Sequence, residues 1–289
     1  MTFDAFRDIL LDAFPGVTEE QFGRFAQMEP LYRDWNAKIN VISRKDMDAL
    51  YNHHVLHSLA IAKYLSTRGE GYGADEVHTV LDLGTGGGFP GIPLAVLLPQ
   101  WHFTLCDSVG KKTRVAQAVA EALALENVTV VNARAESLTD SFDFVVSRAV
   151  TTLDQFYGWI GDKFTGAVFY LKGGEINPEI SDLLRKFRLQ PSAVHTWRVD
   201  SWLKDDYFAE KFVIEIEKTT FAVPKAQNIK IRDNEKNIPT LQSQACQQAR
   251  LPRAYEHAQR PQGPCCPPPS RPQETDRIFR RQVLVFISI

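Results

Sequence analysis

The sequence contains little cysteine, and most of that cysteine lies near its C-terminal end. Of four cysteines in 289 residues, only Cys106 precedes residue 219. The other three (Cys246, Cys265 and Cys266) lack the spacing of a zinc site. Because small disulfide-stabilised domains need paired cysteines, this usage argues against a disulfide framework and predicts a protein of a reducing compartment.

Long apolar runs and a signal peptide are also absent. No stretch of the sequence approaches the ~20 consecutive apolar residues that a helix needs to cross a bilayer. The first seven residues carry an acid, Asp4, and lack the basic start of a signal peptide. We therefore expect a cytoplasmic protein without membrane association.

Neither sign of charge dominates the chain, whose formal net charge is −2, but the charges are unevenly distributed. Residues 219–289 hold 11 of the 33 Lys and Arg and 5 of the 35 Asp and Glu. The remaining 22 basic and 30 acidic residues lie in 1–218. An acidic main domain has no broad electrostatic attraction for nucleic acid, which leaves room only for a local basic patch.

Residues 1–75 are predicted to form an N-terminal helical cap. Thr18 and Gln21 have the spacing of a capping box at the start of a helix. Apolar residues then recur at helical spacing, although Pro30 is expected to kink or restart this helix. A further helix is expected from Asp46 to Leu65.

Residues 76–218 alternate between short apolar runs and helical stretches. The apolar runs lie at 78–83, 102–106, 128–131, 143–147, 166–171, 193–199 and 211–217. The helical stretches lie at 91–98, 110–125, 152–161 and 177–189. This alternation predicts an α/β fold with a doubly wound, mostly parallel sheet of seven strands. The last two runs have no helix between them and are expected to pair as an antiparallel hairpin, with 211–217 interpreted as an ordinary sheet edge.

Residues 219–289 differ from the rest of the chain in composition. They hold nine of its sixteen prolines and a Gln-rich stretch at 242–248. Many prolines with low hydrophobicity predict a low-complexity tail that is largely disordered.

A glycine-rich loop follows the first apolar run of the α/β segment. Five of the residues from Gly84 to Gly91 are glycine, and a helix is expected directly after them. A strand, a glycine loop and a helix N-terminus together form a nucleotide-cofactor site. The dinucleotide pattern G-x-G-x-x-G fits this loop only in the frame Gly86, Gly88, Gly91, and a single match of that kind is weak.

A second interpretation of the loop begins at Gly84, with Gly86 and Gly88 at alternate positions and Asp82 before them. This pattern resembles the first motif of class I S-adenosylmethionine-dependent methyltransferases, which have a Rossmann-like fold. In that superfamily the loop curls around the amino acid end of the cofactor, and an acid after the second strand takes the ribose hydroxyls. Asp107 stands in that place, and seven strands with a terminal hairpin fit this superfamily better than a dinucleotide-binding domain.

Further motifs narrow the resemblance to one family. In order, they are Trp35–Asn40, His54–Ser58, Asp82–Pro93, Asp107–Lys112, Arg134–Glu136, Ser147–Ala149 and Leu171–Gly174. Together they resemble the bacterial small-subunit (16S) ribosomal RNA guanine-N7 methyltransferase family, also known as glucose-inhibited division protein B. The resemblance covers about 20–217, and His57 departs from it because many members carry Asp there.

This resemblance implies a set of site residues. It places Gly84, Gly86, Gly88 and Phe89 at the cofactor, Asp107 at its ribose, and Ala135 with Glu136 beside its adenine. Arg148, at the end of the fourth strand, is placed where cofactor and target base meet. These positions also agree with the general rule that α/β sheets bind ligands at the carboxyl ends of their strands.

Other charged residues are weaker candidates. Lys172 follows the fifth strand, so it is a second catalytic candidate by the same reasoning as Arg148. Lys111, Lys112 and Arg114 begin a helix beside the cofactor loop and are candidates for contacts with RNA phosphates. Two histidines spaced by four residues have no further ligands near them in the sequence, so we expect no metal site.

The groups needed for two other base methylations are missing. After the fourth strand the sequence reads Ser147-Arg148-Ala149-Val150, not the Asn/Asp-Pro-Pro-aromatic motif typical of amine methylation. Cys106, on the cofactor side, is disfavoured as a nucleophile for methylation of a pyrimidine carbon. The 7-nitrogen of guanine has a free lone pair and no proton to lose, so its methylation needs mainly positioning.

The sequence therefore predicts an enzyme that uses S-adenosyl-L-methionine to methylate a guanine N7 by direct in-line transfer. The expected partner is 16S ribosomal RNA or the small ribosomal subunit, and the expected state is a monomer. The target base has to leave its stack to enter the pocket. Two alternatives stay open: an NAD(P)-dependent oxidoreductase, and a non-catalytic RNA-binding or ribosome-assembly module with the same fold.

Overall fold

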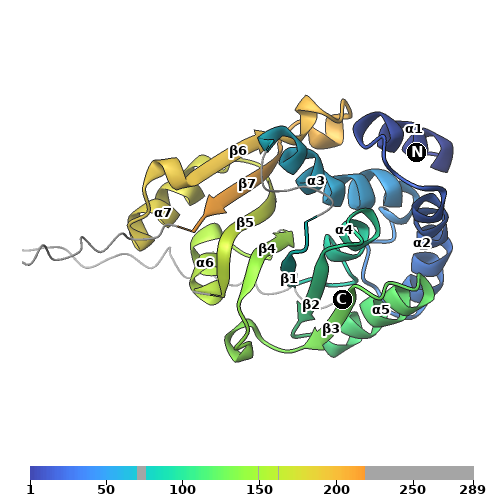
Figure 1. The fold of residues 1–289 in the computed structure, drawn as a ribbon, viewed down its shortest axis with the longest axis horizontal. Coiled ribbons are helices and arrows are strands. Elements are labelled where there is room, and N and C mark those ends of the chain that lie inside the picture. The colour runs from blue at the N-terminus through green and yellow to red at the C-terminus, as the bar shows by residue number, and fades with distance from the viewer. Residues whose placement is uncertain (70–75, 149, 162, 219–289) are drawn as a thin grey trace, which may run out of the picture. The chain divides into compact units, whose positions relative to one another are not determined.

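Seven strands form one sheet in the computed structural model (Figure 1). They are β1 (Thr79–Leu83), β2 (His102–Asp107), β3 (Val128–Asn132), β4 (Phe142–Arg148), β5 (Phe164–Gly173), β6 (Val194–Arg198) and β7 (Lys211–Glu217). Their order across the sheet is β3-β2-β1-β4-β5-β7-β6. The first five strands are parallel, whereas β7 is antiparallel to both β5 and β6. The predicted seven-stranded sheet with a terminal hairpin is confirmed.

The structure describes residues 1–69, 76–148, 150–161 and 163–218. All described residues belong to one compact unit. The tail expected at 219–289 lies outside the described residues. The domain boundaries at 75 and 218 stay predictions. No helix within the described ranges combines the length and apolarity that a membrane span requires.

Helices cover both faces of the sheet, as a doubly wound fold requires (Figure 1). They are α1 (Phe3–Ala13), α2 (Glu19–Lys38), α3 (His57–Arg68), α4 (Gly91–Leu97), α5 (Gly110–Ala122), α6 (Leu153–Ile160) and α7 (Asn177–Phe187). The side chains of β4 alternate between two core clusters, Phe144 and Val146 in one and Val145 in the other. The first cluster contains side chains of α1–α5, and the second contains those of α6 and α7.

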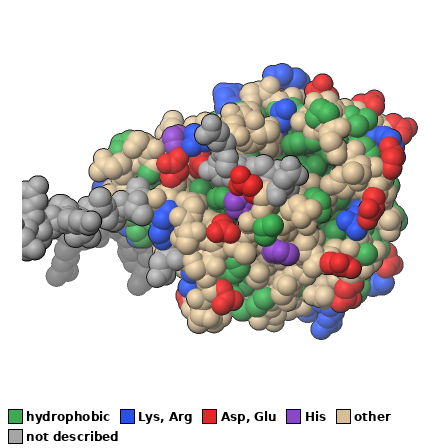
Figure 2. Space-filling model, in the orientation of Figure 1, with side chains coloured by type: hydrophobic (Ala, Val, Ile, Leu, Met, Phe, Trp, Pro, Cys, Tyr) green, Lys and Arg blue, Asp and Glu red, His purple; other side chains and the backbone are tan. Residues whose placement is uncertain are grey.

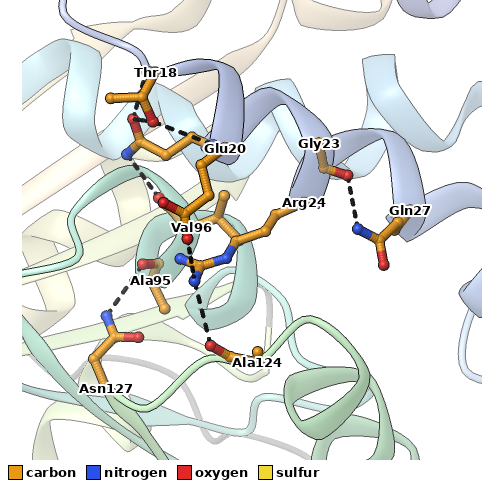
Figure 3. A network of polar contacts seen from close by, with 10 residues as sticks. Thr18, Glu20, Gly23, Arg24, Gln27, Ala95, Val96, Ala124 and Asn127 are labelled. Atoms are coloured by element: carbon orange, nitrogen blue, oxygen red, sulfur yellow. Dashed lines mark hydrogen bonds and ion pairs between the residues drawn. The ribbon is translucent and has the colours of Figure 1, made fainter.

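The N-terminal helices are joined to the sheet domain through the C-terminal end of α4. The last carbonyls of a helix have no partner within the helix. In α4 they accept from two side-chain amides. The Gln21 Nε2 donates to Val96 and Leu97 at 2.9 and 3.0 Å. The Asn127 Nδ2 donates to Ala95 at 3.1 Å (Figure 3). The capping-box glutamine of α2 therefore also fixes the cap to the sheet domain.

α2 continues without a break through Pro30, so the helix restart expected there is wrong. A proline has no N–H, which leaves the carbonyl of Ala26 without its helical donor. The hydroxyl of Tyr51 lies 3.4 Å from that oxygen and 3.2 Å from the carbonyl oxygen of Phe25. The Tyr51 hydroxyl, from a distant part of the chain, thus donates to the carbonyl that Pro30 leaves without a helical donor.

The single helix expected over 46–65 is three consecutive elements. They are the 3-10 turn η1 (Met47–Ala49), the π-helix η2 (Leu50–Leu56) and α3. A π-turn widens the helix and is frequent at functional sites. Here it carries His53 and His54, whose contacts are described below.

The strand β7 is an interior strand, so its interpretation as a sheet edge is wrong. It lies between β5 and β6, and the edges are β3 and β6. Its Glu215 is fully buried, with Oε2 accepting from the Tyr64 hydroxyl at 2.5 Å and lying 3.3 Å from the Arg68 Nε. The acid that suggested an exposed edge is a buried, paired carboxylate.

We expect Glu215→Ala to lower the free energy of unfolding by about 3 kcal/mol, because it removes a buried carboxylate that accepts from the buried Tyr64 hydroxyl and pairs with Arg68. Urea unfolding measures this change. The matched control is Glu217→Ala, which removes the half-exposed second carboxylate of Arg68 and is expected to cost less than about 1 kcal/mol. Equal losses in the two variants would contradict a special role for the buried pair.

Candidate cofactor and substrate site

The loop between β1 and α4 has a backbone that only glycine adopts easily. Gly84, Gly86 and Gly88 have φ values of 76°, 58° and 109°, in the region that side chains rarely allow. A Cβ at Gly84 would also lie 2.4 Å from a methyl of Val150, and one at Gly88 would lie 2.3 Å from Ile92. Backbone conformation therefore favours glycine at all three positions, and close packing adds to this at Gly84 and Gly88.

The carboxylate of Asp82, at the end of β1, fixes both ends of this loop. Its Oδ2 accepts from the hydroxyl of Thr85 at 2.6 Å and from the backbone N–H of Gly91 at 2.8 Å. The side chain is fully buried, and burial raises the pKa of Asp82 to about 7. Its Oδ1 has no hydrogen-bond partner within the described part of the chain.

Asp107 connects the loop to the end of β2. Its Oδ2 accepts from the backbone N–H of Gly86 at 3.0 Å, and its Oδ1 accepts from that of Val109 at 2.8 Å. Only 8% of the residue is exposed. Because a carboxylate has about four acceptor positions, each oxygen can still accept one more hydrogen bond.

A cavity of about 460 Å³ lies at the carboxyl ends of β1, β2 and β4. Its lining includes five residues predicted for the cofactor: Gly84, Asp107, Ala135, Glu136 and Arg148. Its size is that of a small-molecule site. Gly86, Gly88 and Phe89 are not among the lining residues: the two glycines shape the loop, and Phe89 is buried behind it.

Sequence reasoning missed several of the lining residues. They include Ser108, Lys112, Arg134, Val150 and Trp159. Lys112 is predicted only for contacts with RNA, and its position five residues after Asp107 is the signal that could have placed it at the cavity. Trp159 lies on α6, and nothing in its local sequence distinguishes it from a residue that covers the sheet.

Arg148, at the end of β4, is held by the π-helix η2. Its Nη1 donates to the carbonyl of His53 at 3.4 Å, and its Nη2 lies 3.0 Å from the Nδ1 of His54. The guanidinium also lies over the ring of Phe89, 5.3 Å from its centroid. The N-terminal cap and the glycine loop thus both position the residue that was predicted to meet cofactor and base.

His54 supports Arg148 as a neutral acceptor. Burial and the nearby charge of Arg148 lower the pKa of His54 to about 3. Because a guanidinium only donates, the Nδ1 of His54 must carry the lone pair and its Nε2 the proton.

Aromatic rings pack together beside the contact between Arg148 and His54. Tyr207 stacks on His53 with centroids 3.7 Å apart and an interplanar angle of 12°. The Nδ1 of His53 lies 3.2 Å from a carboxylate oxygen of Asp46. His57 packs edge-on against Tyr207 and Phe208, and neither of its ring nitrogens has a hydrogen-bond partner among the described residues. The position that departs from the family motif is a packed core histidine.

Lys172 does not line the cavity. Its Nζ lies 2.9 Å from the Oε1 of Glu179 and donates to the carbonyl of Thr151 at 3.2 Å. Glu179 in turn accepts from the backbone N–H of Leu153. The contacts of Lys172 hold the segment that follows β4, and its catalytic role stays a prediction.

The other predicted cations are on α5. Lys111 and Arg114 are exposed, and Lys112 is half-buried at the cavity. None of the three forms an ion pair with a described residue.

Potential metal ligands converge at one place in the described chain, away from the cavity. His195, Glu215 and Glu217 bring ligand atoms within 4.8 Å of one another. Arg68 forms ion pairs with both carboxylates, so a positive charge already occupies this place. The absence of a metal site stays a prediction.

Comparisons with known proteins agree on one family. The model of the family described as rRNA small subunit methyltransferase G matches residues 19–200. A Flavobacterium psychrophilum protein named ribosomal RNA small subunit methyltransferase G is 46% identical over 215 residues, which cover 72% of this chain and 96% of the relative. A Bacteroides thetaiotaomicron protein of the same name is also 46% identical, with 72% and 98% covered.

A solved structure also resembles the chain. It is magnesium protoporphyrin IX methyltransferase from Synechocystis PCC 6803 with bound SAM, at 14% identity and a TM-score of 0.48. The likeness covers 76% of this chain and 98% of that one.

We expect the wild type to lose stability relative to His54→Asn as the pH falls from 6.5 to 4.5. The pKa of His54 is lower in the folded protein than in the unfolded chain, so the unfolded chain binds an extra proton in this range. The free energies of unfolding of the two proteins should diverge by up to about 1.4 kcal/mol per pH unit. Above pH 7 the difference should be constant.

A second variant tests the acceptor itself. His54→Leu leaves Arg148 without a side-chain acceptor and is expected to cost about 1–3 kcal/mol at pH 8, more than His54→Asn. A pH-independent difference, or equal costs for Leu and Asn, would contradict the neutral-acceptor role.

Proposed function

The chain belongs to the rRNA small subunit methyltransferase G family, and we propose that it methylates the 7-nitrogen of a guanine in 16S ribosomal RNA. The family match confirms the resemblance that the motifs indicate, and it does not favour the oxidoreductase or the non-catalytic module. The methyl donor is S-adenosyl-L-methionine. The observation that carries the proposed reaction is a cavity beside the glycine loop that is lined by both Asp107 and Arg148.

The residues at the cavity fit this cofactor. The cavity has the size of a small-molecule site, and each oxygen of Asp107 can accept a further hydrogen bond, as a ribose diol requires. Ala135 and Glu136 would flank the adenine, and Gly84 would face the amino acid end. Gly86, Gly88 and Phe89 would act by shaping the loop and supporting Arg148. When bound, the cofactor supplies a methyl carbon made electrophilic by a positively charged sulfur.

The proposed step needs no proton transfer. The lone pair of guanine N7 forms the new bond to the methyl carbon, and the electron pair of the broken carbon–sulfur bond stays on sulfur. The positive charge passes from sulfur to the guanine, so the net charge in the site is unchanged. The protein contributes mainly alignment of the two reacting atoms along one line.

The titratable groups around the cavity support this reaction. Of its two lining carboxylates, Asp107 is engaged by backbone amides, and Glu136 is exposed at the adenine side. Cys106 is buried behind the loop, and burial raises the pKa of its thiol to about 11, which makes a poor nucleophile. A reaction that needs a thiolate would therefore lack its main group among the described residues.

Arg148 is the residue that we propose at the junction of cofactor and base. A guanidinium has five N–H donors, and His53 and His54 together accept two hydrogen bonds from it. The remaining donors are available to the base and the cofactor. Lys172 would act on the same junction by holding the segment after β4.

The RNA would approach the carboxyl edge of the sheet, where Lys111, Lys112 and Arg114 begin α5. A base inside a stacked helix cannot reach the cavity, so the target guanine must be turned outward. A cytoplasmic location and a monomeric state belong to this proposal as well.

We expect labelled S-adenosylmethionine to mark one guanine of unmodified small-subunit RNA at N7. Reduction by borohydride followed by aniline cleaves the strand at 7-methylguanosine, which maps the site. Arg148→Ala should reduce the rate by about 100-fold, because the donors at the junction are lost. Label on a different atom would overturn the proposed reaction, and an unchanged rate in the variant would remove Arg148 from it.

We expect Asp107→Ala to weaken binding of S-adenosylmethionine by about 10- to 100-fold, because charge-assisted hydrogen bonds to the ribose and to the loop are lost. Isothermal titration calorimetry measures the affinity. Asp140→Ala is the matched control, since it removes an exposed acid outside the cavity lining. Wild-type affinity in Asp107→Ala would show that the ribose is held elsewhere.

A further inference from the structure

Four cations near the cavity lack the carboxylate partners that many other basic side chains have. Arg33, Lys38 and Lys186 are examples of cations in ion pairs on helices. In contrast, Arg44, Lys45, Lys111 and Lys112 form no ion pair with any described residue. On the face seen in Figure 2, basic and acidic side chains are scattered without a field of one sign. Other cations, such as Lys163 and Arg188, also form no ion pair with a described residue, so it is their position near the cavity that sets these four apart.

Arg44 and Lys45 form the exposed tip of a tight turn. The backbone N–H of Asp46 donates to the carbonyl of Ser43 at 2.9 Å, which closes the turn. Both basic residues are exposed. Two cations are thus presented side by side, and sequence reasoning did not single out either of them.

The chain that leads into this turn is firmly fixed. The Asn36 Oδ1 accepts from the backbone N–H groups of Val41 and Ile42 at 2.8 and 3.0 Å. Its Nδ2 donates to the carbonyl of Ile42 at 2.8 Å, and the Ile42 side chain is buried. The turn therefore starts from a rigid base, which lowers the entropy that binding would cost.

The turn lies on the Arg148 side of the cavity. Val41 packs against the glycine loop so closely that a Cβ at Gly87 would lie 2.9 Å from its side chain. At the other end of the turn, Asp46 contacts His53, whose carbonyl accepts from Arg148. Lys112, in the first turn of α5, lines the cavity together with Asp107, the last residue of β2. Lys112 thus lines the cavity itself, whereas Arg44 and Lys45 lie outside the lining, in a turn that contacts the glycine loop at one end and the support of Arg148 at the other.

We propose that the turn Ser43–Asp46 binds RNA phosphates on the Arg148 side of the cavity, opposite Lys111 and Lys112. A base turned out of its stack is held best when the backbone is bound on both sides of it, because phosphate contacts fix register and orientation. The inference deepens the proposed function and depends on it for the identity of the polyanion.

The test compares Arg44→Gln/Lys45→Gln with the wild type in two assays. One is equilibrium binding of labelled, unmodified small-subunit RNA, and the other is methyl transfer to that RNA. We expect roughly tenfold weaker RNA binding and a correspondingly higher KM for RNA, with kcat and S-adenosylmethionine affinity unchanged. The slope of log affinity against log salt concentration should fall by about 1.4, because each lost phosphate contact removes about 0.7.

The matched control is Lys163→Gln/Arg188→Gln, which removes two cations that form no ion pair with a described residue, one directly before β5 and one directly after α7. Its RNA affinity should stay within twofold of the wild type. Wild-type affinity and salt slope in Arg44→Gln/Lys45→Gln, or an equal loss in the control, would overturn the inference. If the wild type binds the RNA without methylating it, the proposed function fails. The ratio of the RNA affinities of the variant and the wild type then tests by itself whether the turn binds phosphates. If the wild type does not bind the RNA, both fail.

Discussion

The site depends on the two hydrogen bonds that the buried carboxylate of Asp82 accepts. One of its oxygens holds Thr85 at the beginning of the glycine loop and the backbone of Gly91 at its end. A Cβ at Gly91 would lie 2.7 Å from that oxygen, so the glycine is needed for the contact itself. Burying this acid raises its pKa, which means that the folded protein bears a cost to keep the loop in shape. Asp107 holds the same loop from the neighbouring strand, and its position at the cavity follows from that contact.

The N-terminal cap is part of the site rather than an attachment to it. Its helices share one hydrophobic core with α4 and α5, and Gln21 bonds to the end of α4. The hydroxyl of Tyr32 on α2 donates to the carbonyl of Gly87 in the loop at 2.8 Å. The π-helix then presents His53 and His54 to Arg148. Removing the cap would therefore deprive the loop and the arginine of their supports at the same time.

The parts of this structure that follow from local sequence signals could be predicted. Short apolar runs separated by helical stretches located all seven strands, and the run of glycines marked the loop, because each signal lies within a few residues of its effect. The methyltransferase resemblance then indicated Asp107, directly after the second run. The contact of Arg148 with His54 joins residues 94 apart, and no local pattern encodes it. The π-helix and the donor that Tyr51 supplies near Pro30 depend on tertiary packing in the same way. Glu215 misled the edge assignment because a buried acid and an exposed acid look alike until Tyr64 and Arg68 are placed beside it.

The distribution of charge shows how an acidic domain can bind a polyanion. Long-range attraction depends on net charge and is screened within about 10 Å at 0.1 M salt, so the balance of the whole domain matters little at a bound strand. What matters is which cations near the strand are free of carboxylates. On many helices the cations are paired, as Arg33 and Lys186 are, and such exposed pairs add little stability. A carboxylate beside a paired cation does, however, oppose the approach of a phosphate, so the proposed RNA contacts fall to cations near the cavity that form no ion pair with a described residue.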